Sequence, residues 1–327
     1  MPDPTGPDAA EAISRNPATG EVIAAHPFLS AEQVERALAA NARAFAEWRS
    51  TAMAERVERY RRLASILRER SEHLAGLITA EMGKTIREAR AEVEKSAVLL
   101  DWLTEHGPAV LADEPADTGG EDRAWVSFLP IGTVFAVMPW NLPIWQVIRA
   151  SGPIMLSGNG FLLKHATNVI GCAVALEEAY AASGFPPGLF SSVNVDNAAA
   201  ARIIADPRIA AVTLTGSVRA GAAVAEAAGK AVKKSLLELG GADAFIVLAD
   251  ADLDRAVAAA ILSRFGNAGQ VCLAAKRIIV ERPVAEEFIR RFVAAARGVK
   301  AGDPLDPGST IGPIARGDLR DGIHDQV

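Results

Sequence analysis

The chain has few cysteines, no run of basic residues and no long apolar segment. Only two of its 327 residues are cysteine, and thiols exposed to glutathione stay reduced, so we expect a cytoplasmic enzyme. Lysine and arginine number 34 against 40 aspartates and glutamates, a net charge of −6, which argues against nucleic acid or an anionic membrane as a partner. No apolar run approaches membrane-spanning length, and residues 1–20 lack the charged and apolar regions of a signal peptide.

The first third of the chain has the pattern of amphipathic helices. After an extended, proline-containing lead-in over 1–29, Ser30 and Gln33 form a capping box, and apolar residues then recur at helical spacing as far as Leu103. Arginine and glutamate alternate along these helices, which predicts a solvated face. A polar, turn-rich loop over 108–120 and a strand over 124–129 follow.

From residue 132 strands alternate with helices, which predicts an α/β fold with a parallel sheet. The predicted strands cover 133–137, 161–164, 191–195, 211–214, 245–248 and 278–280. The predicted helices cover 143–156, 168–182, 217–228 and 284–296. With 327 residues, half of them hydrophobic, the chain is long enough for two domains and a large core.

Cys272 is the candidate nucleophile. It follows a run of small residues that includes Gly269, whereas Cys172 lies in an apolar helical run typical of a structural thiol. Cysteine attacks as the thiolate, so a catalytic role requires a supporting environment. Without other features a structural role for Cys272 would be the simpler interpretation.

Three further segments supply candidate partners. Asn141, in Pro-Trp-Asn-Leu-Pro, lies where a strand ends and a helix begins, and its carboxamide could donate to an oxyanion; a rigid turn is the alternative. Glu238 lies among apolar residues just before two glycines, so we expect it to be buried and suited to general-base catalysis, or else simply to end a strand. Lys164 is the last residue of a predicted strand. It could donate a hydrogen bond to a ribose or a phosphate, or it could simply be a solvated lysine at the strand end.

The segment Thr215-Gly216-Ser217-Val218-Arg219-Ala220-Gly221 joins a strand to a helix. Backbone N–H groups in such an arrangement can bind a pyrophosphate. The segment is not the Gly-x-Gly-x-x-Gly fingerprint, and Ser217 could serve as a helix N-cap, a role compatible with phosphate binding.

Together, Pro-Trp-Asn-x-Pro, Gly-Ser-x-x-x-Gly, Glu-Leu-Gly-Gly and Gly-Gln-x-Cys stand in the order and at the spacing of the aldehyde dehydrogenase superfamily. The resemblance covers the chain from about residue 12. Within the superfamily the chain is most similar to bacterial NAD(P)-dependent succinate-semialdehyde dehydrogenases, a likeness supported by the runs Leu163–Ala166, Thr215–Ala223 and Gly302–Pro304. The resemblance implies a Rossmann-type cofactor domain with an N-terminal helical arm and an α/β catalytic domain.

The resemblance also implies the chemistry. Cys272 would add to the aldehyde, Asn141 and the Cys272 N–H would bind the oxyanion, and Glu238 would activate water to hydrolyse the thioester. The residues that it assigns to the cofactor are Pro139, Trp140, Lys164, Thr167, Gly216, Ser217, Gly221 and Leu239. NAD-preferring relatives often have glutamate at position 167, so the neutral Thr167 leads us to expect use of NADP, and of NAD too. No metal site is assigned.

The same resemblance bears on the substrate. Trp145 and Arg149 are four residues apart on one helix face, and an arginine at this offset binds the far carboxylate in succinate-semialdehyde enzymes. Some relatives carry a second arginine at the position of Gly266. The small-molecule substrate is therefore expected to be succinate semialdehyde, with another aldehyde as an alternative and a helix-surface role for Arg149 also open.

Domain organisation follows from the resemblance. We expect a helical arm and cofactor domain over 1–237, with a projecting oligomerisation hairpin near 113–131, and an incomplete catalytic domain over 238–327. Family members continue beyond Val327, and residues 321–327 have the pattern of a helix interior, so we expect a fragment whose full-length form is a homo-dimer or homo-tetramer. A non-catalytic cofactor-binding remnant is the competing interpretation.

Overall fold

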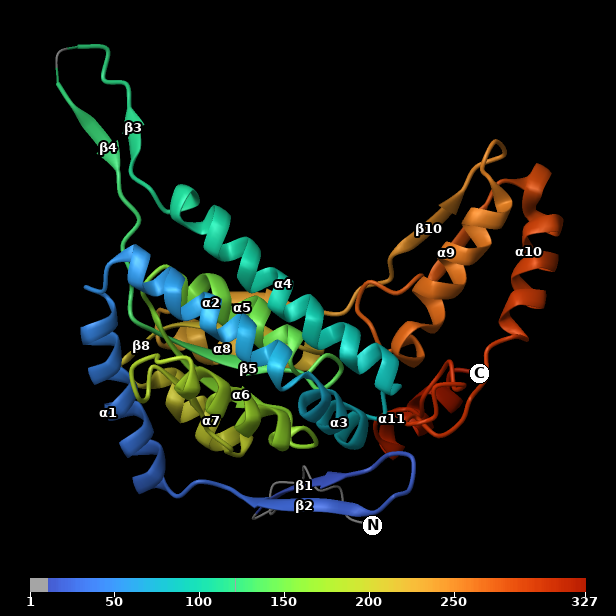
Figure 1. Ribbon diagram of the computed structural model, residues 1–327, viewed down its shortest axis with the longest axis horizontal. Coiled ribbons are helices and arrows are strands. Elements are labelled where there is room, and N and C mark those ends of the chain that lie inside the picture. Colours follow the sequence, from blue (N-terminus) through green and yellow to red (C-terminus); the bar gives the residue numbers. More distant parts are fainter. Residues whose placement is uncertain (1–10, 121) are drawn as a thin grey trace.

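A five-stranded parallel sheet organises the computed structural model, which describes residues 11–120 and 122–327 (Figure 1). Its order is β7-β6-β5-β8-β9, and every neighbouring pair is parallel. The strands are β5 (Thr133–Met138), β6 (Gly160–His165), β7 (Phe190–Ser192), β8 (Ile209–Thr215) and β9 (Lys234–Glu238). The central strands β5 and β6 are almost wholly buried, as their continuous apolar composition requires in a sheet covered on both faces.

The carboxyl ends of four strands lie level with one another. Val137 of β5 pairs with Lys164 of β6 on one side and with Leu214 of β8 on the other, and Leu214 pairs with Leu237 of β9. The chain runs outward from β5 through β6 to β7 and then returns to β8, on the opposite side of β5. The strand order therefore reverses between β5 and β8, the place where open α/β sheets bind ligands.

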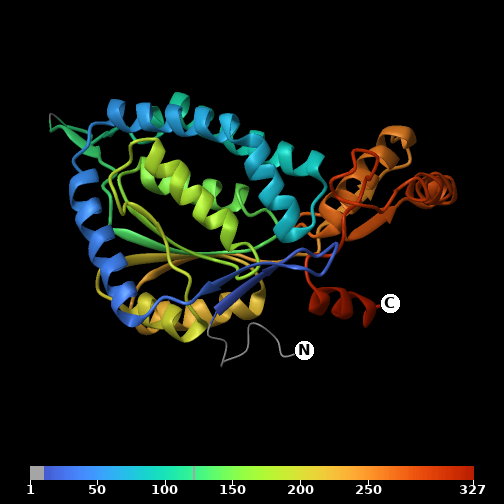
Figure 2. The same ribbon diagram turned by 60° about the horizontal axis from the view of Figure 1, so that its bottom comes forward.

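Helices cover both faces of this sheet (Figure 2). One face packs against α5 (Trp145–Leu156) and α6 (Ile170–Ala182), behind which lie α2 (Met53–Glu69), α3 (Ser71–Met82) and α4 (Ile86–Val110). The other face packs against α7 (Asn197–Ala205) and α8 (Val218–Lys230). Helix α1 (Ala31–Trp48) crosses the opposite, amino-terminal edge of the sheet, where buried Asn41 donates to the carbonyl oxygens of Phe161 and Leu189.

Two buried carboxylates cap the helices that follow β5 and β6. Glu81, at the end of α3, accepts hydrogen bonds from the N–H groups of Gly171 and Cys172 at 2.9 and 3.0 Å, at the start of α6. Glu92 of α4 does the same for α5. A carboxylate at a helix N-terminus satisfies free N–H groups and complements the helix dipole, so these contacts fix both helices relative to α3 and α4.

Smaller elements lie outside the central sheet. β1 (Glu11–Arg15) pairs with β2 (Val22–Pro27), and β3 (Glu114–Ala116) pairs with β4 (Ala124–Val126) in a projecting hairpin (Figure 1). A third hydrophobic cluster, around Val247, Val257, Ala260 and Phe288, joins the parallel pair β10 (Ala244–Val247) and β11 (Arg277–Val280) to α9 (Leu253–Phe265) and α10 (Arg282–Ala296). A 3-10 turn, η1 (Gly266–Gly269), and α11 (Gly317–His324) complete the chain.

The predicted α/β architecture is confirmed, and several local predictions are corrected. The strand predicted over 124–129 ends at Val126, and α4 extends to Val110, into the segment predicted as a loop. The lead-in forms β1 and β2 where it is described; its first ten residues lie outside the described part of the chain. Helices α7 and α9 and the edge strand β9 were not predicted, and α11 ends at His324 rather than continuing to residue 327.

No helix among residues 11–120 and 122–327 combines the length and the apolarity that crossing a membrane requires.

Candidate active site

A cavity of about 440 Å³ opens at the carboxyl edge of the sheet, beside the point where the strand order reverses. Cys272, Glu238, Trp145, Arg149 and Leu239, all predicted site residues, line it together. They come from α5, from the end of β9, and from the loop after η1. A smaller cavity of about 190 Å³, between α1 and α7, contains none of the predicted site residues.

The backbone just before Cys272 is strained. Asn267, Ala268 and Gly269 have φ values of 54°, 55° and 75°, so three consecutive residues adopt the left-handed region. For the two non-glycine residues this conformation costs of order 1 kcal/mol each, and it persists only where surrounding contacts hold it. A Cβ on Gly269 would stand 3.0 Å from the carbonyl oxygen of Arg264, so this glycine is needed for close backbone packing rather than for access to the thiol.

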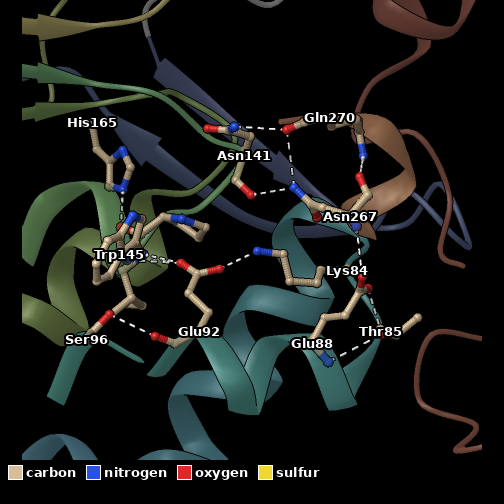
Figure 3. A network of polar contacts seen from close by, with 12 residues as sticks. Lys84, Thr85, Glu88, Glu92, Ser96, Asn141, Trp145, His165, Asn267 and Gln270 are labelled. Carbon is tan, nitrogen blue, oxygen red and sulfur yellow. Dashed lines mark hydrogen bonds and ion pairs between the residues drawn. The ribbon is translucent and has the colours of Figure 1, made fainter. Parts of the chain in front are cut away.

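Glu88 of α4 holds this strained loop. Its carboxylate accepts a hydrogen bond from the N–H of Asn267 at 2.8 Å and another from the Thr85 hydroxyl at 2.8 Å. The Asn267 side chain in turn donates to the carbonyl oxygen of Asn141 at 2.9 Å (Figure 3). One carboxylate therefore fixes the start of the loop that presents Cys272.

The loop that carries Asn141 is held by buried groups of α4 and β6. Glu92, 3% exposed, accepts the N–H groups of Ile144 and Trp145 at 2.9 and 3.0 Å, and pairs with the equally buried Lys84 (Figure 3). His165 contacts the carbonyl oxygen of Pro143 through Nε2 at 2.9 Å. The loop is thus fixed on both sides by polar groups inside the core.

Burial lowers the pKa of His165 to about 4, although the nearby carbonyl oxygens of Pro143 and Met138 act in the opposite direction. The ring is therefore neutral near pH 7. The N–H of Ala166 donates to Nδ1 at 3.0 Å, which leaves Nε2 as the nitrogen that donates to Pro143.

Asn141 lies beside the cavity rather than in its lining. Its Nδ2 donates to the carbonyl oxygen of Gln270 at 2.9 Å, and its buried Oδ1 has no hydrogen-bond partner among the described residues. A carboxamide nitrogen carries two hydrogens, so one remains available to a ligand. The structure therefore brings Asn141 into the same network as the Cys272 loop.

Glu238 departs from the expectation of a buried carboxylate. Its side chain is 50% exposed at the end of β9, and its nearest charged partner is Arg149, with Nη2 at 3.9 Å from Oε2. β9 is an edge strand with largely exposed residues, so the apolar neighbours in the sequence do not enclose it. Arg149 also contacts Gln146 Oε1 at 3.2 Å, which aligns its guanidinium along α5 toward the cavity.

The two cysteines differ as their contexts predicted. Cys172 is fully buried at the start of α6, and burial, reinforced by the nearby Glu81 carboxylate, raises the pKa of its thiol well above the usual range. Cys272 is partly exposed in the cavity wall, and its carbonyl oxygen accepts a hydrogen bond from Lys276. Only Cys272 is placed to react with a solute.

The residues assigned to the cofactor lie along the same sheet edge, outside the cavity except for Leu239. Lys164 is 9% exposed, and burial lowers the pKa of its ammonium, an effect that nearby Asp196 opposes. It forms no hydrogen bond or ion pair in the described part of the chain. A largely buried lysine that lacks a protein partner favours a polar ligand group at its ammonium, so its position fits a cofactor contact.

The start of α8 fits an anion. Ser217 is the N-cap and accepts from the N–H of Ala220 at 3.2 Å, which confirms the capping role, and this first turn is exposed. Gly221 allows close packing, because a Cβ there would stand 2.6 Å from a methyl carbon of Leu239. Pro139, Trp140 and Thr167 follow β5 and β6, and Gly216 follows β8, all at the carboxyl edge of the sheet.

Sequence reasoning missed the residues that hold the two loops. Lys84, Glu88, Glu92 and His165 belong to this group, and the first three lie in the region predicted as a solvated, charged face. Glutamates at i and i+4 on one helix repel each other by a few tenths of a kcal/mol. The i, i+4 spacing of Glu88 and Glu92 could therefore have indicated, from the sequence, that each carboxylate has a partner outside its own helix.

Comparisons with known proteins agree with this geometry. A model of the aldehyde dehydrogenase family matches residues 6–327. The chain is 52% identical over 319 residues to the NAD(P)+ succinate semialdehyde dehydrogenase Sad of Escherichia coli (strain K12), covering 98% of this chain and 69% of that protein. It is 42% identical over 314 residues to an NADP+ succinate-semialdehyde dehydrogenase of Mycobacterium bovis (strain BCG / Pasteur 1173P2), covering 95% and 69%.

Two solved structures are similar throughout the chain. The structure of Gox0499 has a TM-score of 0.95 at 38% identity, with 97% of this chain and 69% of that one covered. Succinic semialdehyde dehydrogenase from Streptococcus pyogenes, solved in complex with NADP+, has a TM-score of 0.94 at 33% identity, with 96% and 69% covered. The chain thus spans about 69% of the length of each of these relatives.

Proposed function

Because the chain belongs to the aldehyde dehydrogenase family, we propose that it oxidises succinate semialdehyde to succinate with NADP or NAD, using Cys272 as the nucleophile. One observation carries the proposal: a thiol, a carboxylate and a guanidinium, from Cys272, Glu238 and Arg149, line one cavity at the edge of the sheet. They can serve as a nucleophile, a base and a carboxylate-binding group, and the oxidation of an aldehyde that also carries a carboxylate requires all three.

In this mechanism the Cys272 thiolate adds to the aldehyde carbon, and the carbonyl oxygen becomes an oxyanion. The free Nδ2 hydrogen of Asn141 and the N–H of Cys272 donate to that oxygen; one such donor contributes roughly 3–4 kcal/mol to the transition state. The Gln270 carbonyl keeps the Asn141 carboxamide oriented. Since both donors are neutral, they stabilise the oxyanion without protonating it.

The nicotinamide nucleotide, when bound, supplies the acceptor for the hydride whose departure turns the thiohemiacetal into a thioester. Lys164, Thr167, Ser217 and the first turn of α8 would hold it, supported by the largely buried, unpaired side chain of Lys164 and the exposed N-terminus of α8. Thr167 is neutral and would not repel a 2′-phosphate, so we propose that the protein accepts both nucleotides.

Glu238 then completes the cycle. It takes a proton from water, the hydroxyl oxygen attacks the thioester carbon, and the Cys272 thiolate leaves with the electron pair of the broken C–S bond. The half-exposed position of Glu238 gives it contact with water, and Nη2 of Arg149 lies 3.9 Å from its carboxylate. Arg149 and Trp145 line the same cavity as Glu238, and we propose that they bind the far carboxylate of the substrate.

We propose that the protein forms a homo-dimer or homo-tetramer in which the β3–β4 hairpin contacts a second copy. Exposed Trp125, Val126, Phe128 and Leu129 support this, because apolar side chains gathered on a projecting hairpin favour a partner surface. We further propose that 1–237 forms the cofactor-binding part and 238–327 the catalytic part.

The test is reduction of NADP and of NAD by the purified chain with succinate semialdehyde. We expect reduction that disappears in Cys272→Ala, while nucleotide binding by that variant is unchanged. Loss of both properties would identify a folding defect. Nucleotide binding with no reduction by the unchanged chain would contradict the proposal and favour a non-catalytic protein. Unchanged succinate-semialdehyde kinetics in Arg149→Ala, with other aldehydes oxidised equally well, would contradict the substrate assignment.

A further inference from the structure

Lys95 of α4 places a second positive charge in the cavity wall. Its Nζ lies 4.0 Å from the centre of the Trp145 ring, and both residues line the cavity with Arg149. An ammonium over an indole face is held by the negative potential of the ring yet stays accessible to anions. Two cations therefore line the cavity with Trp145: Arg149, one turn along α5, and Lys95, from the neighbouring helix.

Most of the charges lining the cavity are already committed to the protein. The charged residues of the lining are Lys84, Glu88, Glu92, Lys95, Arg149 and Glu238. Lys84 and Glu92 form a fully buried pair, and Glu92 also accepts two backbone N–H groups. Glu88 is occupied by Thr85 and by the backbone of Asn267.

Two cations remain that could bind a ligand. Arg149 is shared with Glu238 at 3.9 Å. Lys95 makes no hydrogen bond or ion pair within the described ranges, and its only recorded interaction is with the uncharged Trp145 ring. The positive charge in this cavity that no protein carboxylate neutralises is therefore that of Lys95.

The loop before Cys272 brings no charge to the cavity. Its lining residues Gly266, Asn267 and Val271 are uncharged, and a Cβ built on Gly266 would meet nothing within 4 Å apart from its chain neighbours. A charged group at the far end of a substrate would therefore find the available positive charges on α4 and α5.

We propose that Lys95 determines specificity, acting with Arg149 to bind the carboxylate of an aldehyde acid across the face of Trp145. The inference rests on the proposed function for the reaction but concerns which residue selects an anionic substrate. Two cations on different helices can contact both oxygens of one carboxylate, and an uncharged aldehyde gains nothing from them.

The kinetic test compares succinate semialdehyde with butanal, an uncharged aldehyde of the same chain length, in the full chain. In Lys95→Ala we expect KM for succinate semialdehyde to rise about fivefold, with kcat and the butanal constants unchanged, as for a partly exposed ion pair. Lys95→Arg should restore the original KM. Lys230→Ala removes the same charge from an exposed site on α8, outside the cavity lining, and should change nothing.

A second readout needs no turnover. Succinate should protect Cys272 from alkylation by iodoacetamide, and Cys172 does not interfere because it is buried. In Lys95→Ala about fivefold more succinate should be needed for half protection, and added salt should weaken protection less than in the unchanged chain. Unchanged protection in Lys95→Ala, with weakened protection in Arg149→Ala, would overturn the inference.

The two readouts separate the inference from the proposed function. If the unchanged chain does not oxidise succinate semialdehyde but succinate protection depends on Lys95, the reaction assignment fails and the anion-binding role stands. If oxidation occurs and neither readout responds to Lys95→Ala, the reaction stands and the role of Lys95 is refuted.

Discussion

The two loops that meet at the cavity are held in different ways. The loop after β5, which carries Asn141, leaves a strand that is buried along its length and is fixed by His165 and Glu92, both nearly inaccessible to water. The loop before Cys272 adjoins a small two-stranded unit with four fully enclosed apolar residues, and three of its residues have positive φ. The first loop is held by buried polar groups. The second loop has a strained backbone that is held by a hydrogen bond to Glu88.

Because of this difference, two residues of one helix are expected to affect different properties of the protein: one its stability, the other its activity. Glu92 and Glu88 lie one turn apart on α4, and each accepts backbone N–H groups from one loop. Glu92 is also half of a buried ion pair, whereas Glu88 is partly exposed. We therefore expect damage at Glu92 to cost mainly folding free energy and damage at Glu88 to cost mainly catalysis.

The largest effect is expected at Glu238, on the more exposed side. Glu238→Gln should slow thioester hydrolysis roughly 10²–10⁴-fold, because the amide cannot take a proton from water. The unfolding free energy should change by less than about 0.5 kcal/mol, since the side chain is half exposed. Stopped-flow recording should show a preserved burst of reduced cofactor followed by a slow phase; a missing burst would remove Glu238 as the base for hydrolysis.

Next is Glu92→Gln, which leaves the ammonium of Lys84 buried without a counter-charge. The unfolding free energy should fall by about 3 kcal/mol, as measured by denaturant titration. The double variant Lys84→Met with Glu92→Gln should recover part of that loss, because it removes the uncompensated charge. Equal losses in the single and double variants would show that the pair is not what holds this loop.

Glu88→Gln is the matched change on the other loop. Loss of a charged acceptor at the Asn267 N–H should cost about 1.5 kcal/mol of loop positioning, or roughly tenfold in kcat and in the alkylation rate of Cys272. The unfolding free energy should fall less than in Glu92→Gln. If both variants reduce stability equally and spare alkylation, the contrast between the two loops is wrong.

The smallest effect is a pH dependence that comes from His165. Because its folded pKa, about 4, lies below the usual value near 6.5, the unfolded chain takes up a proton first as pH falls. The resulting stability is complete above pH 6.5 and decreases between pH 6.5 and 4, by about 1 kcal/mol from pH 6.5 to 5.5. His165→Gln should flatten this slope, and His324→Gln, at an exposed histidine, should not.

Elements whose residues carry a strong local pattern could be predicted from the sequence, and elements without such a pattern could not. β5 and β6 are recognisable because continuous apolar runs between turns are typical of strands buried on both faces. β9 and α7 were missed, the first because it is a largely exposed edge strand and the second because it is short and rich in alanine. Local composition carries no comparable signal for such elements.

The candidate site divides in the same way. Cys272 and Glu238 could be named because each belongs to a short motif, and Arg149 because of its offset from Trp145 and the family resemblance. The structure places all three in one cavity. The partners that hold the loops lie 52 residues apart in the Glu92–Ile144 contact and 179 in the Glu88–Asn267 contact, so the sequence alone does not join them. The burial of Glu238 was mispredicted because its apolar neighbours in the sequence belong to an exposed edge strand and do not enclose its side chain.

Mass spectrometry of the Glu238→Gln chain after mixing with succinate semialdehyde and NADP tests the role of Cys272 directly. We expect a succinyl thioester on the peptide that contains Cys272 and none on the peptide that contains Cys172, because only Cys272 lines the cavity and its thioester is not hydrolysed. Reduced cofactor without any adduct on Cys272, or an adduct on another residue, would contradict the claim that Cys272 is the nucleophile.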